Sequence, residues 1–128
     1  MAPSNPPSLI SRFFWWLPIG HVAEITPEEL IKEMEIPNMS TQLLDVRTRK
    51  EWSNDHIKGT INIPITELRS KKNELPFIKD KPIVAICLSA HRSIPAVRLL
   101  RSQGFRNVSQ LSGGMRAWRQ HGLKESKK

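Results

Sequence analysis

The chain has few cysteines, no apolar run of membrane-spanning length and few aromatic residues outside its beginning. Cys87 is its one cysteine among 128 residues. No disulfide can therefore form within the chain, and a disulfide-stabilised secreted fold is excluded. No zinc-ligand spacing of His and Cys occurs, so we expect neither a metal nor an organic cofactor. The length suits one ordinary domain, and no repeat or low-complexity segment divides it.

The most aromatic stretch lies near the beginning, over residues 9–20. It is far shorter than the roughly 20 apolar residues that span a bilayer. It has neither a basic start nor a clear cleavage site, so a signal peptide is not expected. We interpret its aromatic residues as a cover for an apolar edge or a dimer contact, and a weak contact with a membrane or another partner as the alternative. They are Phe13, Phe14, Trp15 and Trp16.

Composition sets the domain boundaries and the expected partners. Residues 1–20 form a flexible Pro-rich start with the aromatic segment, 21–123 the domain, and 124–128 a charged tail. Lysine and arginine total 20 against 12 acidic residues, a net charge of +8. These charges are spread along the chain without a nucleic-acid-binding motif. We therefore expect an anionic substrate or an acidic partner, and no nucleic acid.

Short apolar runs alternate with helical patterns from residue 21 onward. Strands are expected at 21–25, 42–46, 82–87 and 108–111, and a further strand, led by Gly59, is expected within 57–63. Helices are expected from a cap at Thr26 to Pro37, at 48–54, from Pro64, at 93–103 and at 115–121. The run 82–87 is the most apolar and β-branched, which is typical of a central strand. The alternation predicts an α/β fold with a mostly parallel sheet.

The segment from Cys87 to Ser93 joins that central strand to the next helix. Open α/β sheets bind ligands at the carboxyl ends of their strands. A tight turn there directs backbone N–H groups, and the helix N-terminus behind them, toward one hollow that favours anions. A lone cysteine is by type more often a buried, inert residue. At the lip of such a hollow, with Arg92 and His91 nearby, its nucleophilic thiolate is favoured instead.

Three ordered groups of motifs resemble the rhodanese family of sulfurtransferases over nearly all of residues 25–122. The first is DVR at 45–47, EW at 51–52, HIKG at 56–59 and NIP at 62–64. The second is Cys87 with Arg92 and Ser93, and the third is GF at 104–105, NV at 107–108, Leu111, GGM at 113–115 and AW at 117–118. The resemblance implies a rhodanese-like three-layer fold: a central, mainly parallel five-stranded sheet with helices on both faces.

The resemblance also implies roles for individual residues. Cys87 is the expected catalytic nucleophile. The expected anion-binding loop is Leu88, Ser89, Ala90, His91, Arg92 and Ser93. Position 90 is alanine where many family members have glycine, and a positive φ would strain it.

Four polar residues outside the loop look catalytic by type, but we interpret them as structural support. They are Asp45, Arg47, Glu51 and His56. Buried paired charges usually hold strand ends and loops in place through charge-assisted hydrogen bonds. Trp52 and Trp118 are expected to pack in the core.

The expected activity is sulfur transfer by double displacement. Cys87 takes sulfane sulfur from an anionic donor such as thiosulfate, becomes a persulfide, and passes the sulfur to a thiol, cyanide or a protein. A reducing compartment suits such a thiol, which favours the cytoplasm. Two alternatives stay open: an interaction or sulfur-carrier module without efficient turnover, and a Cys-dependent phosphatase or arsenate reductase. The related phosphatase loop is one residue longer than this one.

Overall fold

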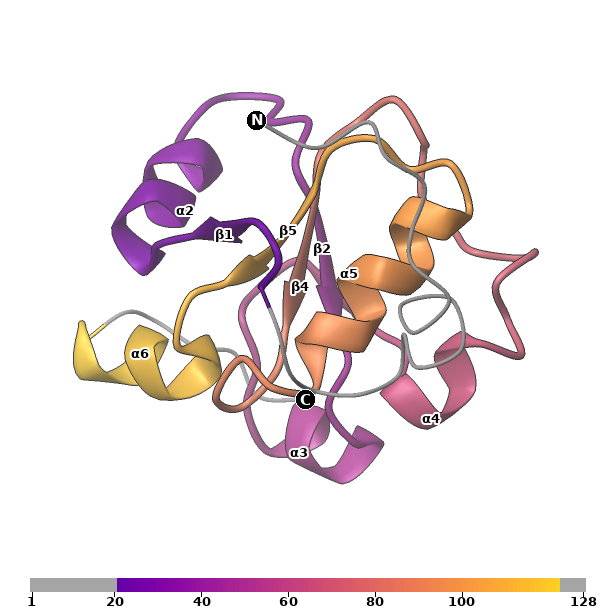
Figure 1. Cartoon of the computed structure of the whole chain (residues 1–128). Coiled ribbons are helices and arrows are strands. Elements are labelled where there is room, and N and C mark those ends of the chain that lie inside the picture. The colour runs from indigo at the N-terminus through magenta and orange to yellow at the C-terminus, as the bar shows by residue number, and fades with distance from the viewer. Residues whose placement is uncertain (1–20, 123–128) are drawn as a thin grey trace.

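The computed structural model describes residues 21–122 as a parallel sheet with helices on both faces (Figure 1). The aromatic segment and the charged tail lie outside the described residues. The strands are β1 (Glu24–Ile25), β2 (Gln42–Asp45), β3 (Thr60–Asn62), β4 (Ile83–Ile86) and β5 (Val108–Leu111). The helices are α2 (Pro27–Met34), α3 (Arg49–Asn54), α4 (Ile65–Leu68), α5 (Ser93–Ser102) and α6 (Gly114–Gln120).

The five strands lie in the order β1-β5-β4-β2-β3, and every pairing between them is parallel. β4 is the central strand, as its apolar sequence predicts. Asp45 pairs in register with Ile86 of β4 and Asn62 of β3. The carboxyl ends of β2, β3 and β4 therefore lie side by side at one end of the sheet, and α3 lies at the same end (Figure 1).

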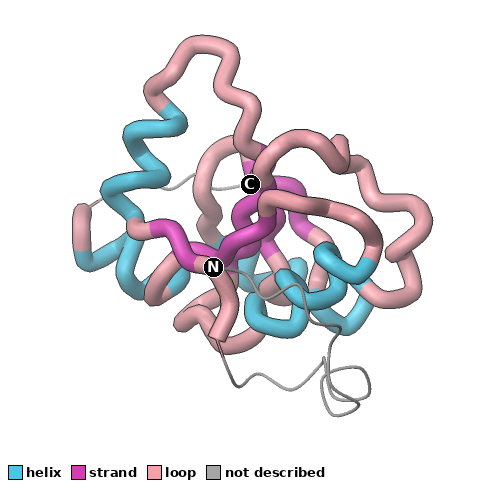
Figure 2. The backbone as a smooth tube through the Cα atoms, turned by 45° about the horizontal axis from the view of Figure 1, so that its top comes forward, coloured by secondary structure: helices cyan, strands magenta, loops and turns pink. Residues whose placement is uncertain are grey.

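Two separate apolar cores cover the two faces of the sheet. Successive residues of a strand point to opposite faces, so Ala85 and Cys87 contribute to one core and Val84 and Ile86 to the other. Helices α4 and α5 cover the first core, and α2 and α6 cover the second. Figure 2 shows the strands, in magenta, enclosed by helices and loops. The expected three-layer α/β fold is confirmed.

Helices α2 and α3 both begin with a capping box. The hydroxyl of Thr26 accepts from the Glu29 N–H, and the Glu29 carboxylate accepts from the Thr26 N–H. Thr48 and Glu51 repeat this arrangement at the start of α3. The first box is predicted from the sequence. The second makes a helix of only six residues begin at a fixed position.

Several element boundaries differ from the sequence prediction by one to three residues. The start of β3 does not, because the strand begins at Thr60, directly after Gly59: Gly59 has φ +90°, and the Thr60 N–H closes a turn onto Ile57. β1 has two residues, since this edge strand pairs with β5 alone. Gly114, expected in a turn with Gly113, is the first residue of α6. In residues 21–122, no helix has the length and apolar character needed to cross a membrane.

Candidate active site

Cys87 follows the last residue of β4, and its side chain lies beneath α5. Only 1% of the residue is exposed. It alternates with Ala85 toward the α5 face, and this explains its depth. The sulfur therefore lies below the surface rather than at the lip of the loop, where the sequence analysis placed it. Its polar neighbour is Ser93, whose Oγ is 3.4 Å from Sγ.

The loop after Cys87 is fixed by the first turn of α6. The Met115 N–H donates to the Cys87 carbonyl at 2.8 Å, and the Arg116 N–H donates to the Leu88 carbonyl at 3.0 Å. A trans peptide directs its N–H opposite to its carbonyl. The N–H groups of Leu88 and Ser89 consequently point away from α6. Within the described residues, no hydrogen bond is donated by the backbone N–H groups of residues 88–92.

Gly114 allows α6 to approach this closely. A Cβ at Gly114 would lie 2.3 Å from the Cys87 carbonyl oxygen and 2.7 Å from two Leu88 backbone atoms. Its φ of +59° also lies in the left-handed region. Both observations require glycine, so Gly114 of the third motif group sets the shape of the cysteine loop.

Ala90 has φ +69°, the positive value that would be strained in a residue with a Cβ. The loop keeps this conformation although the residue is alanine. Beside it, Ser89 Oγ and His91 Nδ1 lie 3.0 Å apart, within hydrogen-bonding distance. His91 is exposed. The two side chains link the loop to itself across the strained residue.

Arg92 is held by Glu51 of α3. Its Nη1 and Nη2 donate to the two carboxylate oxygens at 2.7 and 2.9 Å. These hydrogen bonds are the main reason that the pKa of Glu51 falls to about 2, with further lowering by Thr48. The pKa of Arg92 is raised, again chiefly by Glu51, with smaller contributions from the charges of Cys87 and Asp45. The Arg92 guanidinium is therefore directed at the Glu51 carboxylate.

Asp45 and Arg47 form a buried ion pair at the end of β2. Arg47 donates to Asp45 through Nε and Nη2, with an Nη2–Oδ2 distance of 2.8 Å, and its backbone N–H binds the same carboxylate. The guanidinium also donates to the Asp55 carbonyl. These contacts tie the strand to the end of α3. A supporting role for this pair near the site stays a prediction.

His56 and Trp52 stack with ring centroids 3.9 Å apart. His56 Nδ1 lies 2.7 Å from the Trp52 carbonyl oxygen, and the indole N–H donates to Thr60 Oγ1. Trp52 is only half-buried, in contrast to Trp118 with 1% exposure, so the expectation of core packing holds for Trp118 alone.

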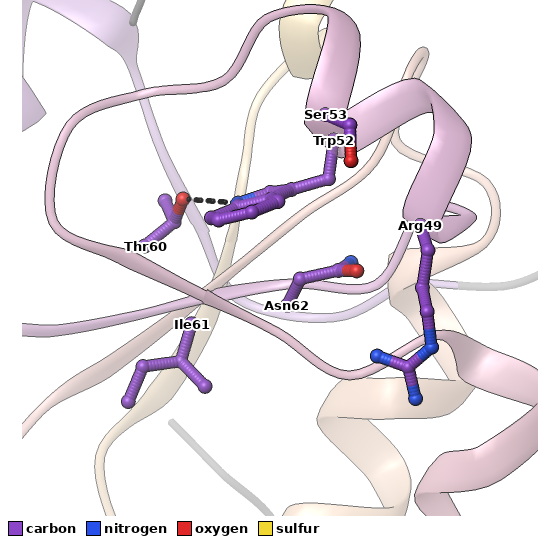
Figure 3. A pocket seen from close by; sticks show the side chains of 6 residues that line it. All are labelled: Arg49, Trp52, Ser53, Thr60, Ile61 and Asn62. Carbon is purple, nitrogen blue, oxygen red and sulfur yellow. Dashed lines mark hydrogen bonds between the residues drawn. The ribbon is translucent and has the colours of Figure 1, made fainter. Parts of the chain in front are cut away.

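Trp52 lines an open pocket of about 420 Å³ between α3 and the edge strand β3 (Figure 3). The residues of its wall are Arg49, Trp52, Ser53, Thr60, Ile61 and Asn62. None of these belongs to the cysteine loop. Arg49 is paired with Glu67 at 2.5 Å.

Two residues that are linked to the cysteine through Ser93 were missed by the sequence analysis. Gln110 of β5 is 3% exposed and accepts from the Ser93 hydroxyl at 2.5 Å. Its amide nitrogen donates to Glu24 of β1 at 2.8 Å. The available signal was a glutamine two positions after Val108, on the same face of β5. Its partner Glu24 lies 86 residues away, and only the parallel register of β1 and β5 brings the two together.

The described residues contain no group of three or more His, Cys, Asp or Glu arranged to hold a metal ion. The site consists of one thiol, a turn whose N–H groups donate to no described residue, and an arginine–glutamate pair beside them. Together with the strand order, these features define an α/β domain of the rhodanese-like class. The chain belongs to the Rhodanese-like domain family, whose pattern matches residues 26–121.

Relatives named sulfurtransferases are among the similar proteins. A sulfurtransferase of Allochromatium vinosum is 33% identical over 102 residues, which cover 80% of this chain and 92% of that protein. The human thiosulfate:glutathione sulfurtransferase is 32% identical over 89 residues, 60% of this chain and 77% of the relative. A rhodanese-related protein from Thermoplasma volcanium superposes with a TM-score of 0.73 at 31% identity, covering 84% of this chain and all of that structure.

Other relatives are longer than the region they share with this chain. The uncharacterised YqhL protein of Bacillus subtilis is 39% identical over 77 residues, 60% of each protein. The chain spans about half the length of this and two further curated relatives, 42% to 60% in each case. The activities of those longer proteins are therefore not assigned to this chain.

Proposed function

We propose that the protein is a thiosulfate-type sulfurtransferase in which Cys87 carries sulfur as a persulfide. One observation carries the proposal: Cys87 is followed by a turn whose first two N–H groups point away from α6 and donate to no described residue. Such groups stabilise negative charge where it develops, as in an oxyanion hole. Family membership and the sulfurtransferase relatives support the same reaction.

The reaction is a double displacement with no external oxidant. The Cys87 thiolate attacks the outer sulfur of thiosulfate, a new S–S bond forms, and sulfite leaves with the electron pair of the broken S–S bond. The terminal sulfur of the Cys87 persulfide carries the negative charge, which the loop N–H groups stabilise. A thiolate, cyanide or protein thiol then attacks that sulfur and regenerates the Cys87 thiolate. A reducing compartment such as the cytoplasm suits this chemistry.

In this proposal, the loop from Leu88 to Ser93 binds the donor anion. The Asp45–Arg47 and Glu51–Arg92 pairs maintain the conformation of that loop. The name of the human relative includes thiosulfate and glutathione, which makes these the first donor and acceptor to test. The phosphatase alternative is less favoured. Both terminal nitrogens of Arg92 are bound to Glu51, whereas a phosphatase needs them for the phosphate.

Mass spectrometry of the intact protein tests the proposal. Incubation with thiosulfate is expected to add one sulfur, about 32 daltons, and a thiol or cyanide is expected to remove it. Because the chain has one cysteine, Cys87→Ser is a complete control and should gain nothing. Absence of the added sulfur in the folded wild type, or turnover of thiosulfate by Cys87→Ser, would contradict the proposal. Cys87-dependent hydrolysis of an aryl phosphate would support the phosphatase alternative instead.

A further inference from the structure

A continuous chain of hydrogen bonds leads from Cys87 across the sheet to Glu24. The Cys87 sulfur lies 3.4 Å from Ser93 Oγ, Ser93 donates to Gln110 at 2.5 Å, and Gln110 donates to Glu24 at 2.8 Å. Cys87, Ser93 and Gln110 are buried, with exposures of 1%, 0% and 3%, and Glu24 lies at the exposed end. This hydrogen-bond chain therefore connects an exposed carboxylate on the edge strand β1 with the buried sulfur.

The direction of every hydrogen bond in this chain is set from the Glu24 end. A carboxylate only accepts hydrogen bonds, so the NH₂ group of the Gln110 amide must face Glu24. Its carbonyl oxygen then faces Ser93 and takes the hydroxyl hydrogen. Ser93 presents only lone pairs to Cys87, and it can accept from the S–H group but cannot donate to the sulfur.

We propose that Glu24 and Gln110 are positioning residues that keep Ser93 a hydrogen-bond acceptor and thereby favour the thiol form of resting Cys87. An anionic sulfur is stabilised further by each donor that is added to the loop N–H groups, and the Ser93 hydroxyl lies within reach of it. Ser93 becomes a donor to the sulfur only by leaving the Gln110 carbonyl, which would then be a buried oxygen without a partner. Glu24 prevents the amide from turning over to relieve that cost. The role rests on the proposed function, because it controls the sulfur that carries the persulfide.

The other charged groups near the sulfur have hydrogen-bond partners outside this hydrogen-bond chain. Arg92 at the start of α5 is paired with Glu51 of α3, and Asp45 of β2 is paired with Arg47. His91 lies within 3.0 Å of Ser89 in the loop. α6 contributes its backbone N–H groups to the loop carbonyls.

Two substitutions free the Ser93 hydroxyl by different routes. Glu24→Gln lets its partner amide turn over, so that NH₂ faces Ser93, and Gln110→Met removes the acceptor altogether. In both, Ser93 can donate to the sulfur. At a given pH, we expect the ratio of thiolate to thiol to rise about threefold to tenfold, the range that one hydrogen bond supplies.

Far-ultraviolet absorbance as a function of pH measures this ratio directly. The chain has one cysteine and no tyrosine, so the thiolate signal comes from Cys87 alone. Glu28→Gln is the matched control. It neutralises an exposed glutamate of α2 that pairs with His121 rather than with the site, and its pH profile should match the wild type. Circular dichroism establishes that each variant is folded.

A double-substitution cycle separates this role from a general structural or charge effect. In a Ser93→Ala background, Glu24→Gln is expected to leave the pH profile unchanged, since the link to the sulfur is missing. An unchanged profile for Glu24→Gln alone, or an equal shift with and without Ser93, would overturn the proposal. The measurement needs no sulfur donor. A shifted profile in a protein that forms no persulfide would refute the proposed function and leave the positioning role intact.

Discussion

At the scale of single residues, Ala90 has the least favourable backbone conformation of the cysteine loop. Its φ of +69° places a Cβ where glycine is the usual residue. The left-handed conformation costs a non-glycine residue about 1–2 kcal/mol. This conformational cost of Ala90 falls within the cysteine loop, whose N–H groups are proposed to bind the anion.

We expect Ala90→Gly to raise the free energy of unfolding by about 0.5–1 kcal/mol. Relief of the strained conformation exceeds the added entropy that glycine gives the unfolded chain. Urea denaturation measures the change. Ala117→Gly, in the interior of α6, is the control and should destabilise by about 0.5–1 kcal/mol. Equal destabilisation by both substitutions would show that Ala90 is unstrained.

The sequence located this residue but not its conformation. Alanine at position 90 stands out against the glycine that is common in the family. The sign of φ depends on how α6 and α5 hold the two ends of the loop. The same limit applies to Arg92, whose charge is evident from the sequence, whereas its pairing with Glu51 depends on the approach of α3.

At the scale of secondary-structure elements, the first turn of α6 and the cysteine loop behave as one unit. Two N–H groups of α6 bind two loop carbonyls, and Gly114 leaves no space between the two backbones. The opposite direction of the loop N–H groups is a consequence of this contact. The position of α6 therefore determines which way the anion-binding groups face.

Gly114→Ala is expected to destabilise the protein by about 3 kcal/mol or more and to abolish persulfide formation. It adds a backbone collision, at 2.3 Å from the Cys87 carbonyl, to the cost of a positive φ. Thermal unfolding and the mass-spectrometric assay measure the two effects.

Gly59→Ala is the matched control for this substitution. Gly59 also has a positive φ, of +90°, but a Cβ there would meet no atom within 4 Å. It should cost about 1–2 kcal/mol, and persulfide formation should remain. If the two alanine variants formed persulfide equally well, α6 would not set the loop geometry.

Helix α3 performs two tasks through one side chain. Glu51 completes the capping box at Thr48 and also binds Arg92 at the end of the cysteine loop. The first contact is local and follows the pattern S/T-x-x-E, although the sequence analysis named that pattern only at Thr26. The second joins residues 41 positions apart and follows only from the packing of α3 against the sheet edge.

At the scale of the whole molecule, the Glu51–Arg92 pair contributes to stability in a way that depends on pH. The pKa of Glu51 is about 2 in the folded state against an ordinary value of 4.5. Because the folded-state value is the lower one, the stabilisation is fully present above pH 4.5. It is lost progressively as the pH falls toward 2.

We expect Glu51→Gln to lower the free energy of unfolding near neutral pH by about 1–2 kcal/mol, a value reduced for partial solvent exposure. Glutamine retains the capping box, so the substitution isolates the ion pair. Denaturant unfolding over a pH series should show the difference from wild type shrinking as the pH falls from 4.5 toward 2.

Glu67→Gln is the control for the ion pair, because Glu67 pairs with Arg49 at a site where the arginine is 58% exposed. Its effect should be within about 0.5 kcal/mol across the series. A pH-independent difference for Glu51→Gln would mean that shape, and not charge, accounts for the contribution of Glu51.

The sequence by itself determined the order of strands and helices, the central strand, the two-sided burial of the sheet and the identity of the one sulfur nucleophile available. These features depend on local periodicity, on helix signals and on composition, which are read along the chain. Tertiary structure alone decided the depth of Cys87, the partner of Arg92, the direction of the loop N–H groups and the link from Ser93 through Gln110 to Glu24. Each of these depends on atoms brought together from distant segments, and a sheet register or a backbone contact places such atoms only after the chain has folded.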